Sequence, residues 1–260
     1  MTRPSRSLHP LILAPLIYAV CVGAIYLFLG TESRFSGVLL GIYPHSEITF
    51  PFSIQSVSFA LWSVGVALAL SIHLDISDLA GAASHKLLPQ TQEKLLSKAG
   101  ASGLIGSIRQ IPATKRKLFD EAAIVALQQY VANGSISRGR ETFFDVLNGG
   151  VDRLENKISP IRFIAWALPS LGFIGTVMGI SNALSSVASL PPNVEATSMR
   201  MWLQGLVSEL SVAFDTTFTA LILALTVVFS IHFTQQRIQE LFSEVEESFL
   251  NRIHNRLYED

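Results

Sequence analysis

The sequence predicts an all-α, polytopic membrane protein with four transmembrane helices and a helical cytoplasmic domain. Only 15 % of its 260 residues are charged and 49 % are hydrophobic, whereas ordinary soluble domains carry about 25 % charged residues. Four apolar runs also approach the roughly 20 residues that a membrane-spanning helix needs. These runs are 11–29, 54–74, 163–187 and 210–233.

The first run follows Arg3 and Arg6, as the apolar part of a secretory signal does. It is longer than the apolar region of such a signal, about 7–15 residues, and no clear cleavage site of small residues follows it. We therefore expect a retained span. Cys21, the single cysteine, lies inside this run, which excludes an intrachain disulfide and is typical of a small buried apolar side chain.

The basic residues are unevenly distributed between the connecting segments. The two short loops, about 30–53 and 188–209, hold only Arg34 and Arg200, and the remaining 17 of the 19 lysines and arginines lie in the other non-apolar segments. Cytoplasmic loops of membrane proteins are enriched in these residues. Both termini are therefore predicted on the cytoplasmic side.

The apolar runs divide the chain into four parts. An N-terminal two-span hairpin occupies 1–74 and a cytoplasmic helical segment occupies 75–160. A pore-forming transmembrane hairpin follows at 161–233, and a cytoplasmic tail helix occupies 234–260.

The segment 75–160 contains helical patterns. A helix is expected over 117–134, where Asn133-Gly134 supplies a C-terminal stop. A second helix is expected from Arg138 to about Ile158, ending before Pro160. The glycine-containing 100-GASGLIGSIRQ-110 lacks the G-K-S/T ending of a phosphate-binding loop, so a flexible linker is expected there.

The tail is predicted to continue the fourth span as an amphipathic helix with an acidic outer face. Two arrangements of its apolar stripe are open. The stripe packs either on the cytoplasmic segment of its own chain or against other copies around a central axis. The stripe consists of Ile238, Leu241, Val245, Phe249, Ile253 and Leu257.

The third and fourth runs each carry a face of small residues. Such faces let helix backbones approach closely in lipid, where hydrophobic burial does not drive association. Tight helix packing alone is sufficient to explain them. The faces are Gly172, Thr176, Gly179 and Ala183 with Gly175 beside them, and Ala213, Thr217, Ala220 and Ala224.

Two features favour a hydrated pore over packing alone. Thr176 and Thr217 are expected at a similar depth in antiparallel spans. Asp215 is the one acidic residue well inside a predicted span, where a carboxylate usually faces a bundle interior or a water-filled cavity. It shares a helical face with Thr219 and Thr226, and Thr216 adjoins that face.

A structural alternative for Asp215 is a pair with Arg200 or a hydrogen bond to a neighbouring threonine. The functional interpretation is an ion site, because a carboxylate attracts a cation and carries a proton when its pKa is raised.

Other classes of function lack support in the sequence. It shows no nucleotide-binding motif, no catalytic triad and no metal-ligand constellation of histidine, cysteine and carboxylate, so neither an enzyme nor a cofactor is expected. The net charge of −1 gives no electrostatic footprint for nucleic acid.

The pairing of 169-PSLGFIGTVMGI-180 with 213-AFDTTFTALILAL-225 resembles the MotA/TolQ/ExbB proton-channel family. Its members show a P-x-L/I-G-L/F-L/I-G-T-V-x-G-I/L span followed by an A-L-x-T-T-x-x-G-L span. The first motif matches almost throughout. The second has Phe214 for the usual leucine and Ala220 for the usual glycine, and the resemblance covers about 160–235.

The resemblance implies a homopentamer around two copies of a single-span partner of the ExbD, TolR or MotB kind in a bacterial inner membrane. Flow of H+ or Na+ then drives rotation or mechanical work. Thr176 and Thr217 become pore-lining residues that face an aspartate of the partner, and the glycines admit the partner helix closely.

Some positions depart from the family pattern. ExbB-type members place a glutamate five residues before the second threonine, where this chain has Val212. Asp215, one turn further on, is expected to supply the charge. Four spans resemble the MotA arrangement. The residues of the two motifs, however, are closer to the TolQ/ExbB or phage-defence (ZorA-like) branch than to flagellar MotA.

Two other functions compete with an ion-driven motor subunit. One is a secondary transporter of a small solute, although no repeat relates the first and second pairs of spans. The other is a membrane scaffold that acts through segment 75–160 and the tail.

Overall fold

The structure is a computed structural model that describes residues 10–29, 38–39, 53–79, 96–188 and 196–258. Of these residues, 92 % are helical, and they contain no strand beyond an isolated bridge between Leu96 and Leu257. The all-α class is therefore confirmed. The predictions that involve Arg3, Arg6 and Arg34 lie outside the described residues.

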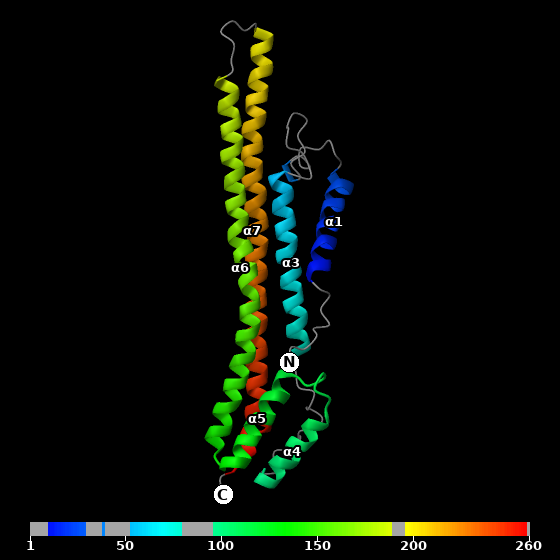
Figure 1. The fold of residues 1–260 in the computed structure, drawn as a ribbon, viewed down its shortest axis with the longest axis vertical. Coiled ribbons are helices and arrows are strands. Elements are labelled where there is room, and N and C mark those ends of the chain that lie inside the picture. The colour runs from blue at the N-terminus through cyan, green and yellow to red at the C-terminus, as the bar shows by residue number, and fades with distance from the viewer. Residues whose placement is uncertain (1–9, 30–37, 40–52, 80–95, 189–195, 259–260) are drawn as a thin grey trace. The chain divides into compact units, whose positions relative to one another are not determined.

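Six α-helices and one short 3-10 helix are described (Figure 1). They are α1 (Pro10–Leu29), α3 (Ile54–Leu79), α4 (Lys98–Gln110), α5 (Leu118–Asn133), α6 (Ile136–Ala188), α7 (Ala196–Arg252) and η2 (His254–Arg256).

Three segments of the described chain are long and apolar enough to cross a membrane, judged by length and composition. They are Ile54–Ser77 in α3, Ile136–Val187 in α6, and Ser198–Arg256, which covers most of α7 and continues into η2. Helix α1 contributes a shorter apolar stretch, Ile12–Ile25. The expected spans 54–74, 163–187 and 210–233 thus coincide with candidate membrane helices. The first expected span, 11–29, stays a prediction.

The described residues form two compact units. One contains 10–71 and 159–232 and is called the span unit, and the other contains 72–158 and 233–258 and is called the tail unit. The boundary on α6 falls between Ile158 and Ser159.

In the span unit, α6 and α7 lie side by side and α3 packs against both (Figure 1). A Cβ added to Gly65 of α3 would lie 3.2 Å from Ile164 of α6 and 3.6 Å from Val227 of α7. The indole nitrogen of Trp62 on α3 donates a hydrogen bond of 2.7 Å to the Thr226 hydroxyl on α7. The three candidate spans therefore form one packed group.

Helix α6 corrects the expectation that a helix ends before Pro160. It continues through both Pro160 and Pro169 to Ala188. A proline removes one backbone hydrogen bond and disfavours the helix locally, but apolar side chains on both sides of Pro160 are buried and hold the helix in place. These are Leu154, Ile158, Ile161, Ile164 and Leu168.

Helix α4 corrects the expectation of a linker over 100–110. The helix begins after Ser97, whose hydroxyl accepts a hydrogen bond of 3.2 Å from the Gly100 N–H. Each internal glycine costs about 1 kcal/mol of helix stability. Burial of one helical face outweighs this cost, and that face consists of Ala101, Leu104, Ile105 and Ile108.

The expected helix over 117–134 is confirmed as α5. It ends at Gly134, whose φ of 71° lies in the left-handed region that favours glycine. The Gly134 N–H bonds to the Tyr130 carbonyl at 2.8 Å. The Asn-Gly pair therefore acts as the stop that the sequence indicates.

The tail continues α7 as expected, and its apolar stripe is buried within this chain. All six stripe residues are at most 9 % exposed, whereas Glu240 and Glu244 face outward. Phe249 stacks on Phe143 of α6 with ring centroids 3.7 Å apart. Of the two arrangements considered, the tail adopts the one in which the stripe packs on its own chain.

Replacing Phe249 by alanine is expected to detach the tail. Truncating a buried aromatic side chain costs about 3–5 kcal/mol, and here it also removes the stack on Phe143. Limited proteolysis of the purified protein should show faster cleavage within 234–258.

The matched control is Gln239→Ala, which shortens an exposed side chain on the same segment and should leave the cleavage rate unchanged. Equal cleavage rates in the two variants would mean that the stack does not hold the tail.

Candidate functional site

The candidate functional site lies along the contact between α6 and α7, called the seam, where glycines of α6 face small residues of α7. A Cβ added to Gly172 would lie 2.8 Å from the Ala220 Cβ, and one added to Gly179 would lie 2.5 Å from the Ala213 Cβ. One added to Gly175 would overlap the Thr216 side chain. Larger residues at these three positions would force the helices apart.

The sequence-predicted packing residues thus meet in one place. Ala183, Ala213 and Ala220 are buried as well, at 4 %, 0 % and 0 % exposure. The structure corrects one detail of the expectation. The three glycines face α7 of the same chain. The space beside them is therefore filled by α7 and not left open for a partner helix.

The close approach brings the hydroxyls of Thr176 and Thr217 into direct contact. Each hydroxyl also reaches a carbonyl of the opposite helix. Thr217 Oγ1 lies 2.9 Å from the Gly172 carbonyl oxygen, and Thr176 Oγ1 lies 3.2 Å from the Ala213 carbonyl oxygen. The expected match in depth of the two threonines is borne out by this contact.

Thr216 adds a third hydroxyl to the group. It is 3 % exposed and donates a hydrogen bond of 2.7 Å to the Ala213 carbonyl, which Thr176 also reaches. We call Thr176, Thr216 and Thr217, with the carbonyls of Gly172 and Ala213, the threonine cluster. Its oxygens belong to the hard class of ligand that alkali and alkaline-earth cations and protons prefer.

The hydroxyls of the threonine cluster have more acceptors within reach than they have protons to donate. A hydroxyl has one proton to donate and two lone pairs that accept, and each of Thr176 and Thr217 has two carbonyls and the other hydroxyl within reach. The hydroxyl protons can therefore be rearranged without breaking helix hydrogen bonds. Both side chains are half-buried, so the cluster reaches the surface of the hairpin.

A second polar contact lies on the seam nearer the end of α6 and the start of α7. The Ser186 hydroxyl donates to the Glu209 carboxylate at 3.1 Å, and the Trp202 indole donates to the Ser186 carbonyl at 3.1 Å. Glu209 precedes Thr217 by eight residues, about 12 Å of helix. The seam thus carries polar groups at two depths.

Asp215 is on the other side of α7. Residues two apart on an α-helix differ by about 200°, so Asp215 does not share the orientation of Thr217. The residues that share its face contact other elements: the Thr219 hydroxyl donates to the Val38 carbonyl at 3.1 Å, and Thr226 accepts from Trp62. The structure therefore separates half-buried Asp215 from the threonine cluster.

Sequence reasoning missed Glu209 because it assigned 188–209 to a loop, whereas α7 begins at Ala196. A signal was present: Glu209 stands four residues before Ala213 and so extends the small-residue face by one turn. Trp62 was missed because nothing in the sequence relates it to Thr226.

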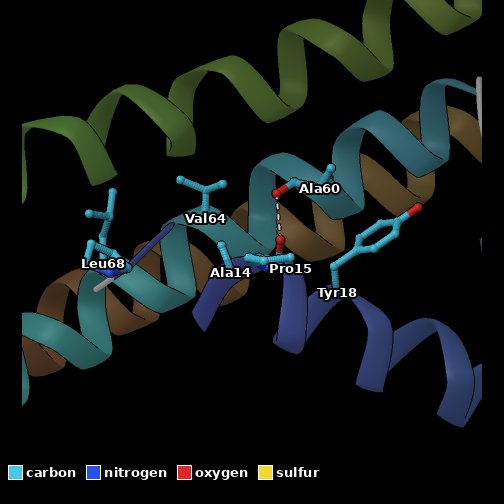
Figure 2. A pocket seen from close by; sticks show the side chains of 8 residues that line it. Ala14, Pro15, Tyr18, Ala60, Val64 and Leu68 are labelled. Atoms are coloured by element: carbon cyan, nitrogen blue, oxygen red, sulfur yellow. Dashed lines mark hydrogen bonds between the residues drawn. The ribbon is translucent and has the colours of Figure 1, made fainter. Parts of the chain in front are cut away.

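A cavity of about 390 Å³ lies between α1 and α3 (Figure 2). None of the described residues that line it is charged, and the Ser63 hydroxyl is bonded to the Ala60 carbonyl of its own helix at 2.7 Å. Polar groups from different helices converge on the seam and not on this cavity. Within the described residues, no cluster of three metal-ligating side chains occurs either.

A family model for the MotA/TolQ/ExbB proton channel family matches residues 114–247, which is just over half of the chain. The chain belongs to the MotA/TolQ/ExbB proton channel family. The match includes the whole of α5, the threonine cluster and about half of the tail, and it extends beyond the 160–235 of the motif resemblance. No curated protein and no solved structure matches the chain.

Membership in this family defines the class of function. Its members are ion-conducting channel or motor subunits of membranes and not enzymes. The α6–α7 seam lies inside the matched region, so the candidate site and the family assignment concern the same pair of helices.

Replacing Gly179 by alanine is expected to open the seam. The new Cβ would lie 2.5 Å from the Ala213 Cβ and 2.9 Å from its Cα. Overpacking of this kind costs about 1–3 kcal/mol. The melting temperature of the purified protein in detergent should fall accordingly.

Gly205→Ala is the control on α7, because a Cβ there meets nothing within 4 Å. Alanine favours a helix over glycine, so this variant should melt at the wild-type temperature or above. A Gly179 variant with unchanged stability would show that the helices do not meet as closely as described.

Proposed function

We propose that this protein is the ion-conducting subunit of a membrane motor driven by a proton- or sodium-motive force. Ion flow past the threonine cluster is converted into rotation or another form of mechanical work. The cluster carries the proposal, because it places three hydroxyls and two carbonyls where glycines of α6 meet small residues of α7.

The chemistry of the cluster suits transient binding. A hydroxyl or carbonyl oxygen binds Na+ or accepts a hydrogen bond from a protonated group without holding a fixed charge. Conduction requires sites that bind strongly enough to admit an ion and weakly enough to release it. The ion itself is proposed as H+ or Na+, and no cofactor takes part.

Glu209 is proposed as the carboxylate of the outer part of the pathway, with Ser186 as its hydrogen-bond donor. It lies on the same seam as the threonine cluster, whereas Asp215 is directed about 200° away from Thr217. If Asp215 belongs to an ion pathway, that pathway follows the α3 side of α7 instead.

The proposed assembly is a homopentamer around two copies of a single-span partner of the ExbD, TolR or MotB kind. Large apolar side chains flank the threonine pair at helical spacing and are at least 38 % exposed in the single chain. Lipid, neighbouring copies and a partner helix are the surfaces that cover such a face in a membrane. The flanking residues are Phe173, Ile180 and Leu184 on α6 and Phe214, Leu221 and Leu225 on α7.

The proposed location is a bacterial inner membrane, with four spans and both termini in the cytoplasm. The distribution of lysine and arginine supports this orientation. The residues of the two sequence motifs favour an ExbB-like or ZorA-like motor over flagellar MotA.

Valine at position 217 or 176 is expected to lower ion flux about tenfold, the loss that follows from removing one polar ligand of about 1–3 kcal/mol. The assay is flux into liposomes that contain the protein with its partner, read with a proton-sensitive and a sodium-sensitive dye. Ser185→Ala is the control, because the Ser185 hydroxyl bonds to the Ser181 carbonyl of its own helix and, among the described residues, to no other helix.

Two carboxylate variants then test the route. Glu209→Gln should reduce flux if ions follow the seam, and Asp215→Asn should leave it near the wild-type value. Reduced flux in Asp215→Asn with normal flux in Glu209→Gln would mean that the pathway follows the α3 side of α7. Full flux in both threonine variants would remove the pore assignment.

Native mass spectrometry of the membrane complex, co-expressed with an adjacent single-span partner, should show five copies of this chain with two of the partner. Subunits of known mass make the stoichiometry unambiguous. One or two copies alone would contradict the motor architecture, and the exposed apolar faces would then contact lipid.

A further inference from the structure

The end of the tail unit holds a buried arginine whose charge is not neutralised within the described residues. Arg256 is 4 % exposed, and its Nε and Nη1 atoms are buried without hydrogen-bond partners there. Burying these two N–H groups without an acceptor is unfavourable, because they lose their hydration and gain no hydrogen bond in exchange. The position therefore calls for an anion.

The backbone holds this arginine in place from both sides. The Arg256 carbonyl accepts a hydrogen bond of 2.7 Å from the Leu96 N–H, and the Arg256 N–H donates to the Ile253 carbonyl at 3.1 Å. Two residues further on, the Tyr130 hydroxyl donates to the Tyr258 carbonyl at 2.6 Å. The arginine is thus positioned before any ligand binds, which lowers the entropic cost of binding.

His254, two residues before Arg256, adds a donor, and Arg140 of α6 adds a positive charge near His254. His254 Nδ1 is also buried without a partner, and the His254 ring lies 6.1 Å from the Phe249 ring. Arg140 of α6 lies over the Phe144 ring at 5.5 Å. Burial, and secondarily the charge of Arg140, hold the pKa of His254 below its ordinary value, so the neutral ring keeps one N–H to donate.

We propose that Arg256, His254 and Arg140, called the C-terminal basic cluster, bind an oxyanion of the phosphate class. A guanidinium pairs with phosphate through charge-assisted hydrogen bonds, and the several oxygens of a phosphate can accept from more than one of these side chains. This site is independent of the proposed ion pathway, because none of its residues lies on the seam.

The ligand is a free anion and not a lipid headgroup. Helix α7 continues for 19 residues from Phe233, where the proposed span ends, to Arg252. That is about 28 Å of helix, well beyond the headgroup layer. A bound anion would connect the first turns of α6 to the end of α7 and so stabilise the tail unit.

The test measures inorganic phosphate binding to the full-length protein in nanodiscs of neutral lipid, at constant ionic strength with chloride as the exchanged anion. Phosphate should raise the melting temperature of the wild type by mass action, and calorimetry should give a dissociation constant. Arg256→Gln should abolish the response. Arg140→Gln, at an exposed position, should weaken binding about tenfold, the loss of one charge-assisted hydrogen bond.

Arg138→Gln is the matched control on α6, since Arg138 is exposed and outside the cluster, and it should bind phosphate as the wild type does. Without phosphate, Arg256→Gln should be at least as stable as the wild type because it removes an unpaired buried charge. An equal phosphate response in the wild type and in both cluster variants would overturn the site.

Carboxylates of the same chain are the alternative source of negative charge. Glu259 and Asp260 follow Arg256 in the sequence and lie outside the described residues. If only a Glu259→Gln/Asp260→Asn variant responds to phosphate, these side chains occupy the site and the free-anion proposal is wrong. A phosphate response in the wild type that this double variant retains supports the proposal.

Discussion

The close contact between glycines of α6 and small residues of α7 is the constraint on which the rest of the span unit depends. Lipid chains are as apolar as leucine, so helices in a bilayer associate through close packing and hydrogen bonds. With Gly172, Gly175 and Gly179 on one side, the two backbones come near enough for Thr217 to bond to a carbonyl of α6. A side chain at any of these glycines would separate the hydroxyls from the opposite carbonyls.

The same two helices are held together differently in the tail unit. There, large apolar side chains fill a conventional core, and the Phe143–Phe249 stack lies within it. Close backbone contact is suited to lipid, whereas burial of large side chains is effective only against water. The change from small to large contact residues along α6 and α7 therefore follows the change of solvent expected from the sequence.

The polar residues of α7 lie on two different faces of that helix. Thr216 and Thr217 turn to α6, whereas Thr219 and Thr226 contact residue 38 and α3. A run of threonines and an aspartate looks like one hydrated lining when read along the sequence. The 100° step between successive helical residues divides it into a seam with hydroxyls and carbonyls and a second face that includes Asp215. Glu209, which bonds to Ser186, belongs to the first.

The sequence by itself determined the all-α class, the small-residue faces, the stop at Gly134 and the family. Each of these depends on local periodicity or on a contiguous motif, which neighbouring residues carry completely. Only the tertiary structure decided that α6 passes through Pro160, that α4 is a helix, that the glycines face α7 of the same chain and that Glu209 joins the seam. Periodicity shows which residues share a face but not what covers that face, and contacts between distant elements override local propensity.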